Sequence, residues 1–149
     1  MVLDAILAYF HFIAIVVLFA FLTAQLILMR LPLDEPAIRL LGRMDLWYLG
    51  AAIAALATGF LRLGLGAKGG DFYLGAWPIY VKIGLFAAVG ILSVYPTLAF
   101  IRWRRALAHD RAWKLPDDEQ RRIRRLVMIE VHLAALIPLF AVIMSRGLG

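Results

Sequence analysis

The stretch AYFHFIAIVVLFAFL, residues 8–22, contains no Asp, Glu, Lys or Arg and a single histidine, His11. The apolar run around it extends from about residue 5 to residue 29, which exceeds the roughly twenty residues that a helix needs to cross a bilayer. Because a segment inside the bilayer must satisfy its own backbone hydrogen bonds, this run predicts a transmembrane helix.

Three further apolar segments predict helices at about residues 46–65, 77–101 and 117–145. Short connections between consecutive helices favour antiparallel neighbours. The chain is 64% hydrophobic and has no cysteine, so it is too apolar for a soluble domain and has neither disulfides nor thiolate metal sites. We therefore expect an all-α membrane protein in which residues 1–149 form one integral membrane domain, an antiparallel bundle of four transmembrane helices.

The positive charge of the chain is concentrated in one segment. Nine of the sixteen Lys and Arg residues lie in residues 102–125, which we expect to form a basic cytoplasmic loop. Three more arginines fall on the same side, between the first two apolar segments, and four basic residues fall on the other: Arg62, Lys68, Lys82 and Arg146. The positive-inside rule then predicts a multi-pass protein of the bacterial inner membrane with both termini periplasmic. The lipid bilayer, and no nucleic acid, is the predicted partner of this charge.

Polar residues inside the apolar segments point to one layer near the outer face. Ionisable side chains inside a bilayer are costly, so each needs an explanation. At about 1.5 Å per helical residue, the four helices bring four residues to one depth: His11, Arg62, Lys82 and Met144. Each also has an ordinary explanation. His11 can be a hydrogen-bonded interior residue, Arg62 and Lys82 can extend to the headgroups, and Met144 can fill space between helices.

The shared depth of these residues favours a haem site. A neutral imidazole is an axial ligand of haem iron and methionine is a known second ligand, so we predict His11 as the metal ligand and Met144 as a further cofactor contact. Haem carries two propionates, and Arg62 and Lys82 are placed to pair with them near the membrane edge. The predicted cofactor is haem b. The same two cations are the predicted catalytic residues, which hold propionates or an acidic tetrapyrrole substrate.

A second polar layer is expected on the cytoplasmic side. It comprises Arg43, Asp45, Tyr48, Arg102, Glu130 and His132. Glu130 can pair with an arginine of the basic loop, and His132 can serve a second haem, a proton relay or a packing hydrogen bond. Other chemistries have less support, because the apolar segments contain no glycine-rich phosphate loop, no HExxH and no paired acidic motif.

Two sequence features resemble a known group of proteins. A histidine early in the first helix and AWPIYVK, residues 76–82, at the start of the third are similar to features of the HemJ-type protoporphyrinogen oxidase group of small four-helix bacterial membrane proteins. The resemblance implies that His11 binds b-type haem and that Lys82 is functionally required. It also implies that Glu130 corresponds to an acid near the start of the fourth helix.

The chain departs from that group at two motifs. Tyr95 and Pro96 stand where the group has a Tyr-His pair, and MIEVH at residues 128–132 replaces an NE-x-P pattern. Haem binding therefore carries over better than the oxidase reaction. The chain also resembles an uncharacterised family of bacterial inner-membrane proteins of similar length.

The leading hypothesis is a b-type haem-binding inner-membrane protein with a redox or electron-transfer role and, if it is an enzyme, a membrane oxidoreductase. The main alternative is a non-enzymatic accessory or assembly subunit of a larger membrane complex or a homo-oligomer. Ala51, Ala55 and Gly59, at four-residue spacing, are typical of helix association. A third interpretation is a small transporter that uses Glu130 and His132 as a proton relay.

Overall fold

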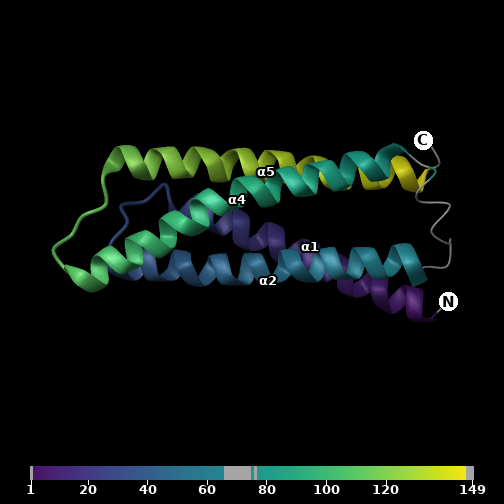
Figure 1. Ribbon diagram of the computed structural model, residues 1–149, viewed down its shortest axis with the longest axis horizontal. Helices are drawn as coiled ribbons and strands as arrows, with labels where there is room; N and C mark the ends of the chain where they lie inside the picture. The colour runs from purple at the N-terminus through teal and green to yellow at the C-terminus, as the bar shows by residue number, and fades with distance from the viewer. Residues whose placement is uncertain (1, 66–74, 76, 147–149) are drawn as a thin grey trace.

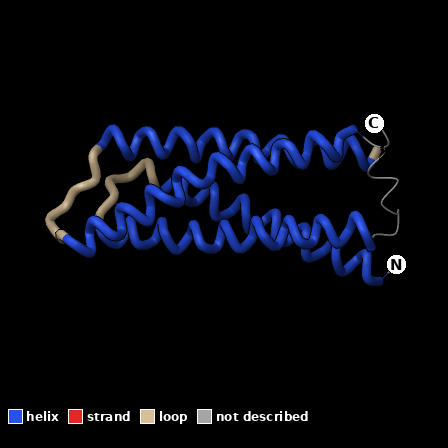
Figure 2. Tube along the Cα trace, in the orientation of Figure 1, coloured by secondary structure: helices blue, strands red, loops and turns tan. Residues whose placement is uncertain are grey.

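The computed structural model describes residues 2–65, 75 and 77–146, so Lys68 lies outside the described residues. It contains four α-helices, α1 (Val2–Leu28), α2 (Glu35–Leu65), α4 (Trp77–His109) and α5 (Asp117–Ser145) (Figure 1). The described residues contain no strand (Figure 2), and all four helices are long and apolar enough to cross a membrane. The predicted fold class, an all-α four-helix membrane bundle, is therefore confirmed.

The helices form two hairpins that pack together. The largest interfaces join α1 to α2 and α4 to α5, and smaller ones join α2 to α4 and α1 to α5. In Figure 1, α1 starts and α5 ends at the same end of the bundle, which we call the terminal end. The opposite end carries the connections 29–34 and 110–116, and we call it the basic end.

The helix α2 begins at Glu35 and not at residue 46, where the apolar segment starts. The backbone N–H of Ala37 donates to Asp34 Oδ1 at 2.9 Å, so Asp34 caps the helix and stabilises its first turn. Arg39 forms an ion pair with Glu35 one turn further on. A capped helix with a polar first part extends beyond the membrane, and the apolar pattern located only its inner part.

The basic segment 102–125 is mostly helical: α5 begins where a helix was predicted, and residues 102–109, expected to belong to the basic loop, continue α4. The helix α4 continues to His109 and α5 begins at Asp117, which leaves residues 110–116 as the connection. The basic side chains gave the appearance of a loop because they interrupt the apolar pattern. Charged residues also occupy the solvated face of a helix whose other face is buried, and that is the arrangement here.

The buried face of this segment joins α4 to α5 beyond the apolar segments. Trp103 and Ile123 are only 0% and 3% exposed. The indole Nε1–H of Trp103 donates to Glu119 Oε1 at 2.9 Å, and Arg102 forms an ion pair with the same carboxylate. Packing and polar contacts therefore hold the two helices together within the segment that was expected to be a basic loop.

The connection between α1 and α2 is fixed to α5 by a glutamine. Gln120 Nε2 donates to the carbonyl oxygens of Met29 and Leu31 at 3.0 and 2.9 Å. Those carbonyls follow the last turn of α1, where no further helical N–H is available to them. One side chain thus ties the two hairpins together at the basic end.

The hydrophobic core lies in the half of the bundle next to the basic end. Its buried residues belong to the ranges 18–29, 38–51, 89–107 and 123–134. Large hydrophobic side chains are also exposed on all four helices, among them Phe12, Ile53, Ile91 and Leu139. An apolar outer surface of this kind suits a hydrocarbon environment.

Candidate functional site

His11 lies between α1 and α2 and is hydrogen bonded to Thr58. His11 Nδ1 and Thr58 Oγ1 are 2.9 Å apart, and Thr58 Oγ1 donates its proton to the carbonyl oxygen of Ala54 at 2.6 Å. A hydroxyl has one proton to donate, so Thr58 accepts the hydrogen bond from His11. This arrangement places a proton on Nδ1 and directs Nε2 to the other side of the ring.

The ring of His11 lies close to the backbone of α2 at Gly59. A Cβ atom at position 59 would lie 3.3 Å from His11 Cε1, closer than ordinary van der Waals contact. Ala51 and Ala55, on the same face of α2, are 7% and 4% exposed. The small-residue series therefore faces the interior of this chain, and its spacing serves internal packing.

Two cations lie near His11. The charges of Arg62 and Lys82 both act on His11, and the two also interact with each other. Within the described part of the chain, neither forms an ion pair with an acid, and Arg62 Nε is buried without a hydrogen-bond partner. We call His11, Thr58, Arg62 and Lys82 the outer polar group. It brings together three of the four residues predicted at one depth and gives this region a positive charge.

Met144, the fourth residue predicted for this layer, is half-buried in the last turns of α5. None of the interactions described for His11 involves Met144, so its role as a second ligand stays a prediction. Across residues 2–65, 75 and 77–146, no group of three or more His, Cys, Asp or Glu side chains could hold a bare metal ion. An iron porphyrin makes a smaller demand, because the macrocycle supplies the equatorial ligands and the protein supplies one or two axial ones.

A second group of polar residues is buried in the half of the bundle next to the basic end. Asp45, Tyr48 and Glu130 were predicted in one layer, and they are 5%, 2% and 1% exposed. Gln25 and Ser93, which the sequence analysis missed, are 1% and 6% exposed. Together with Thr97, these residues form what we call the inner polar cluster, and all four helices contribute to it.

The missed members had a signal in the sequence. Gln25 is a lone amide at the end of an apolar run, and Ser93 and Thr97 lie one helical turn apart within another. Polar residues at a spacing of four share a helix face. A search for charged groups alone passes over them.

The other residues of the predicted layer lie on the outside. Arg43, Arg102 and His132 are all exposed. His132 Nδ1 donates to the carbonyl oxygen of Met128 at 2.7 Å, a local contact within one turn of α5. Glu130 therefore faces the bundle interior without His132, and its charged neighbour is Asp45 and not an arginine.

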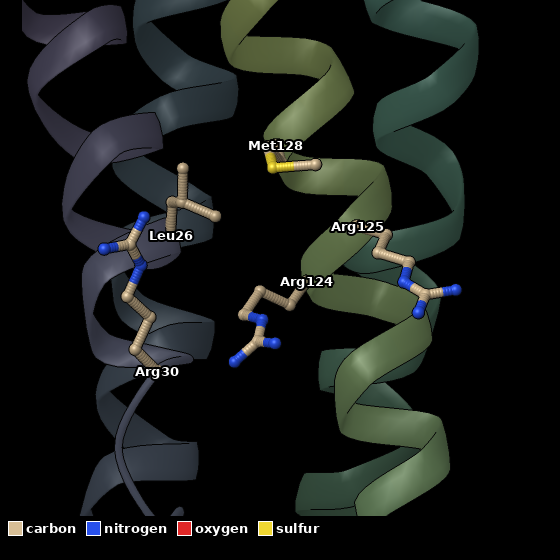
Figure 3. Close-up of a pocket in the computed structure, with 5 residues that line it drawn as sticks. All are labelled: Leu26, Arg30, Arg124, Arg125 and Met128. Atoms are coloured by element: carbon tan, nitrogen blue, oxygen red, sulfur yellow. The ribbon is translucent and has the colours of Figure 1, made fainter.

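A groove with a volume of about 450 Å³ lies between α1 and α5 near the basic end. It is lined by Leu26, Arg30, Arg124, Arg125 and Met128. Figure 3 shows Arg30 and Arg124 on opposite sides of it, whereas Arg125 extends away from the space between the helices. Arginines above apolar side chains suit a phosphate group at a membrane surface.

These features define an integral membrane protein built as a four-helix bundle, with one polar group near each end. The chain belongs to the family DUF2214, described as a predicted membrane protein, which it matches over residues 3–149. No curated protein and no solved structure matches the chain.

Proposed function

We propose that the protein binds b-type haem at the outer polar group, with His11 Nε2 as an axial ligand. The observation that carries this proposal is the hydrogen bond from His11 Nδ1 to Thr58 Oγ1. Histidines that bind metals generally donate their other ring N–H to a nearby acceptor, which fixes the tautomer and orients the ring. Thr58 supplies that acceptor, and its own proton is directed to Ala54.

The surrounding residues fit a haem group. Gly59 lets the imidazole of His11 lie close against the backbone of α2, which holds the ring in place as an axial ligand. Arg62 and Lys82 lack acidic partners among the described residues, and two propionates would neutralise both charges. Met144 is the proposed second ligand. A bound haem supplies redox chemistry, and the protein supplies axial ligation, orientation and electrostatics.

We further propose a redox or electron-transfer role in a bacterial inner membrane, with the basic end in the cytoplasm and both termini periplasmic. Twelve of the sixteen basic residues belong to the two segments that connect helices at the basic end, between the first and second and between the third and fourth apolar segments. The positive-inside rule places that end in the cytoplasm. The resemblance to the HemJ-type group supports a tetrapyrrole-related activity, in which Lys82 and Arg62 hold an acidic substrate.

The test is the absorption spectrum of the protein purified in detergent after expression with adequate haem. We expect a Soret band in the wild type and its loss in His11→Ala. His132→Ala is the matched control, because His132 is also a histidine of a membrane helix but is exposed, and it keeps the band. A wild type without a Soret band contradicts the proposed function, and a His11→Ala variant with full haem contradicts the ligand assignment.

The second candidate function is that of an accessory subunit whose basic end binds anionic lipid or a partner. The groove lined by Arg30 and Arg124 supports this candidate. Purification in a mild detergent distinguishes the two functions. Co-purification of a larger complex without a chromophore favours the accessory role, and a chromophore on the isolated chain favours haem binding.

A further inference from the structure

The inner polar cluster contains two carboxyl groups in the interior of a membrane bundle. Glu130 of α5 is 1% exposed and Asp45 of α2 is 5% exposed. Their charges act on each other, so the two groups are neighbours across the α2–α5 space. Two ionised carboxylates in such a place repel each other and both lack water, so at least one of them needs a bound cation.

The neighbours of Asp45 are hydrogen-bond donors. The side chains of Gln25, from α1, and Thr97, from α4, face the Asp45 carboxyl as hydrogen-bonding groups. Gln25 is itself 1% exposed. Within the described chain, Gln25 Nε2 and Thr97 Oγ1 are buried without a hydrogen-bond partner, so an ionised Asp45 that accepted from both would satisfy two buried donors at once.

Glu130 has different surroundings. Its Oε1 atom is buried without a hydrogen-bond partner among the described residues. The titratable groups that interact with it are Asp45 and Tyr48, both of α2, and Tyr48 is also directed to Ser93 of α4. None of the groups described around Asp45 or Glu130 is a cation. A protonated Glu130 removes one of the two negative charges and gains a proton to donate.

We propose that Asp45 and Glu130 form a proton-binding site, in which the pair holds one proton on Glu130 at neutral pH and the negative charge stays on Asp45. The proton neutralises one of two adjacent buried charges, and the donors Gln25 and Thr97 stabilise the other. This site is independent of haem binding, because it lies in the other half of the bundle and uses none of the outer polar group.

A small metal cation such as Na⁺ is the competing occupant. The cluster contains several oxygen atoms, but the groups directed to Asp45 present N–H and O–H donors. A donor hydrogen next to the carboxylate occupies the position that a metal ion needs. The surroundings of Asp45 therefore favour a proton over Na⁺.

Infrared spectroscopy of the protein in lipid vesicles tests the proposal, since a protonated carboxyl has a C=O stretch that a carboxylate lacks. We expect this band in the wild type at neutral pH, its loss in Glu130→Gln, and its disappearance at a lower pH in Asp45→Asn than in the wild type. The last shift follows because the negative neighbour that holds the proton is gone. Glu119→Gln is the matched control, because Glu119 is the carboxylate of the same helix that already pairs with Arg102, and it leaves the band unchanged.

Three results would overturn the site. The first is a wild type without the band at neutral pH, and the second is a band that survives in Glu130→Gln. The third is loss of the wild-type band when choline is replaced by Na⁺ at constant pH, which would assign the site to sodium. If a variant does not fold, the pH and Na⁺ titrations of the wild-type band still decide between these outcomes. A missing Soret band leaves the site untouched, so the two proposals fail separately.

Discussion

Replacing Thr58 with valine removes the acceptor for His11 while nearly keeping the shape of the side chain. The wild-type hydrogen bond is 2.9 Å long, and its loss leaves a half-buried imidazole N–H without a partner. Such a loss costs about 1–3 kcal/mol, which at about 1.4 kcal/mol per tenfold weakens haem binding by a factor of roughly 5–150. Substitution of groups that orient a metal ligand lowers metal affinity by a similar factor of about 10–100.

The assay is titration of the haem-free protein with haem, followed by the Soret absorbance. Thr58→Ser is the matched control, since it keeps the hydroxyl that accepts from His11 and is expected to bind within a few-fold of the wild type. Equal affinities for Thr58→Val and Thr58→Ser, both below the wild type, would show that the hydroxyl is not what Thr58 contributes, because only Thr58→Ser keeps it. Three equal affinities would refute the role of Thr58 in orienting the ligand.

Two further substitutions test the packing around the two ends. Gly59→Leu is expected to abolish haem binding while far-UV circular dichroism is unchanged, because the first added atom already lies 3.3 Å from His11 Cε1. Gly50→Leu is the control, since it is on the same helix with no atom near its added Cβ, and it should bind haem normally. Equal haem binding by the two variants contradicts the proposed location of haem. Gln120→Ala removes two hydrogen bonds to the end of α1 and is expected to destabilise the protein by about 1–3 kcal/mol, measured by thermal unfolding in detergent. A melting temperature unchanged from the wild type would show that the glutamine tie contributes no stability.

The fold was predictable because a bilayer permits few structures. Four apolar runs in a chain of this length must be helices, and short connections make them antiparallel. The ends of the helices were less predictable, since apolar pattern marks the part inside the membrane. The start of α2 is set by the Asp34 cap, and α4 continues past the apolar segment because Trp103 is buried there and donates to Glu119.

The depth of the candidate site residues along the bundle was predictable from the sequence, but the direction in which each side chain faces was not. The fixed rise of a helix placed His11, Arg62 and Lys82 at one level, and the structure brings these three together. The rotation of each helix about its axis decides which residues at a given depth face the bundle interior. Depth alone does not give this rotation. Glu130 and His132 are two residues apart, yet one is buried and the other exposed.

The placement of the core has a consequence for how the protein opens. The hydrophobic cluster and the Gln120 tie both lie in the half next to the basic end, so that half holds most of the buried contacts. Local opening is easiest where buried contacts are few. Amide hydrogens are therefore expected to exchange faster in the terminal half of the bundle than in the half next to the basic end. A ligand bound at the proposed haem site would enter and leave through such local opening, while the other half of the bundle stays folded.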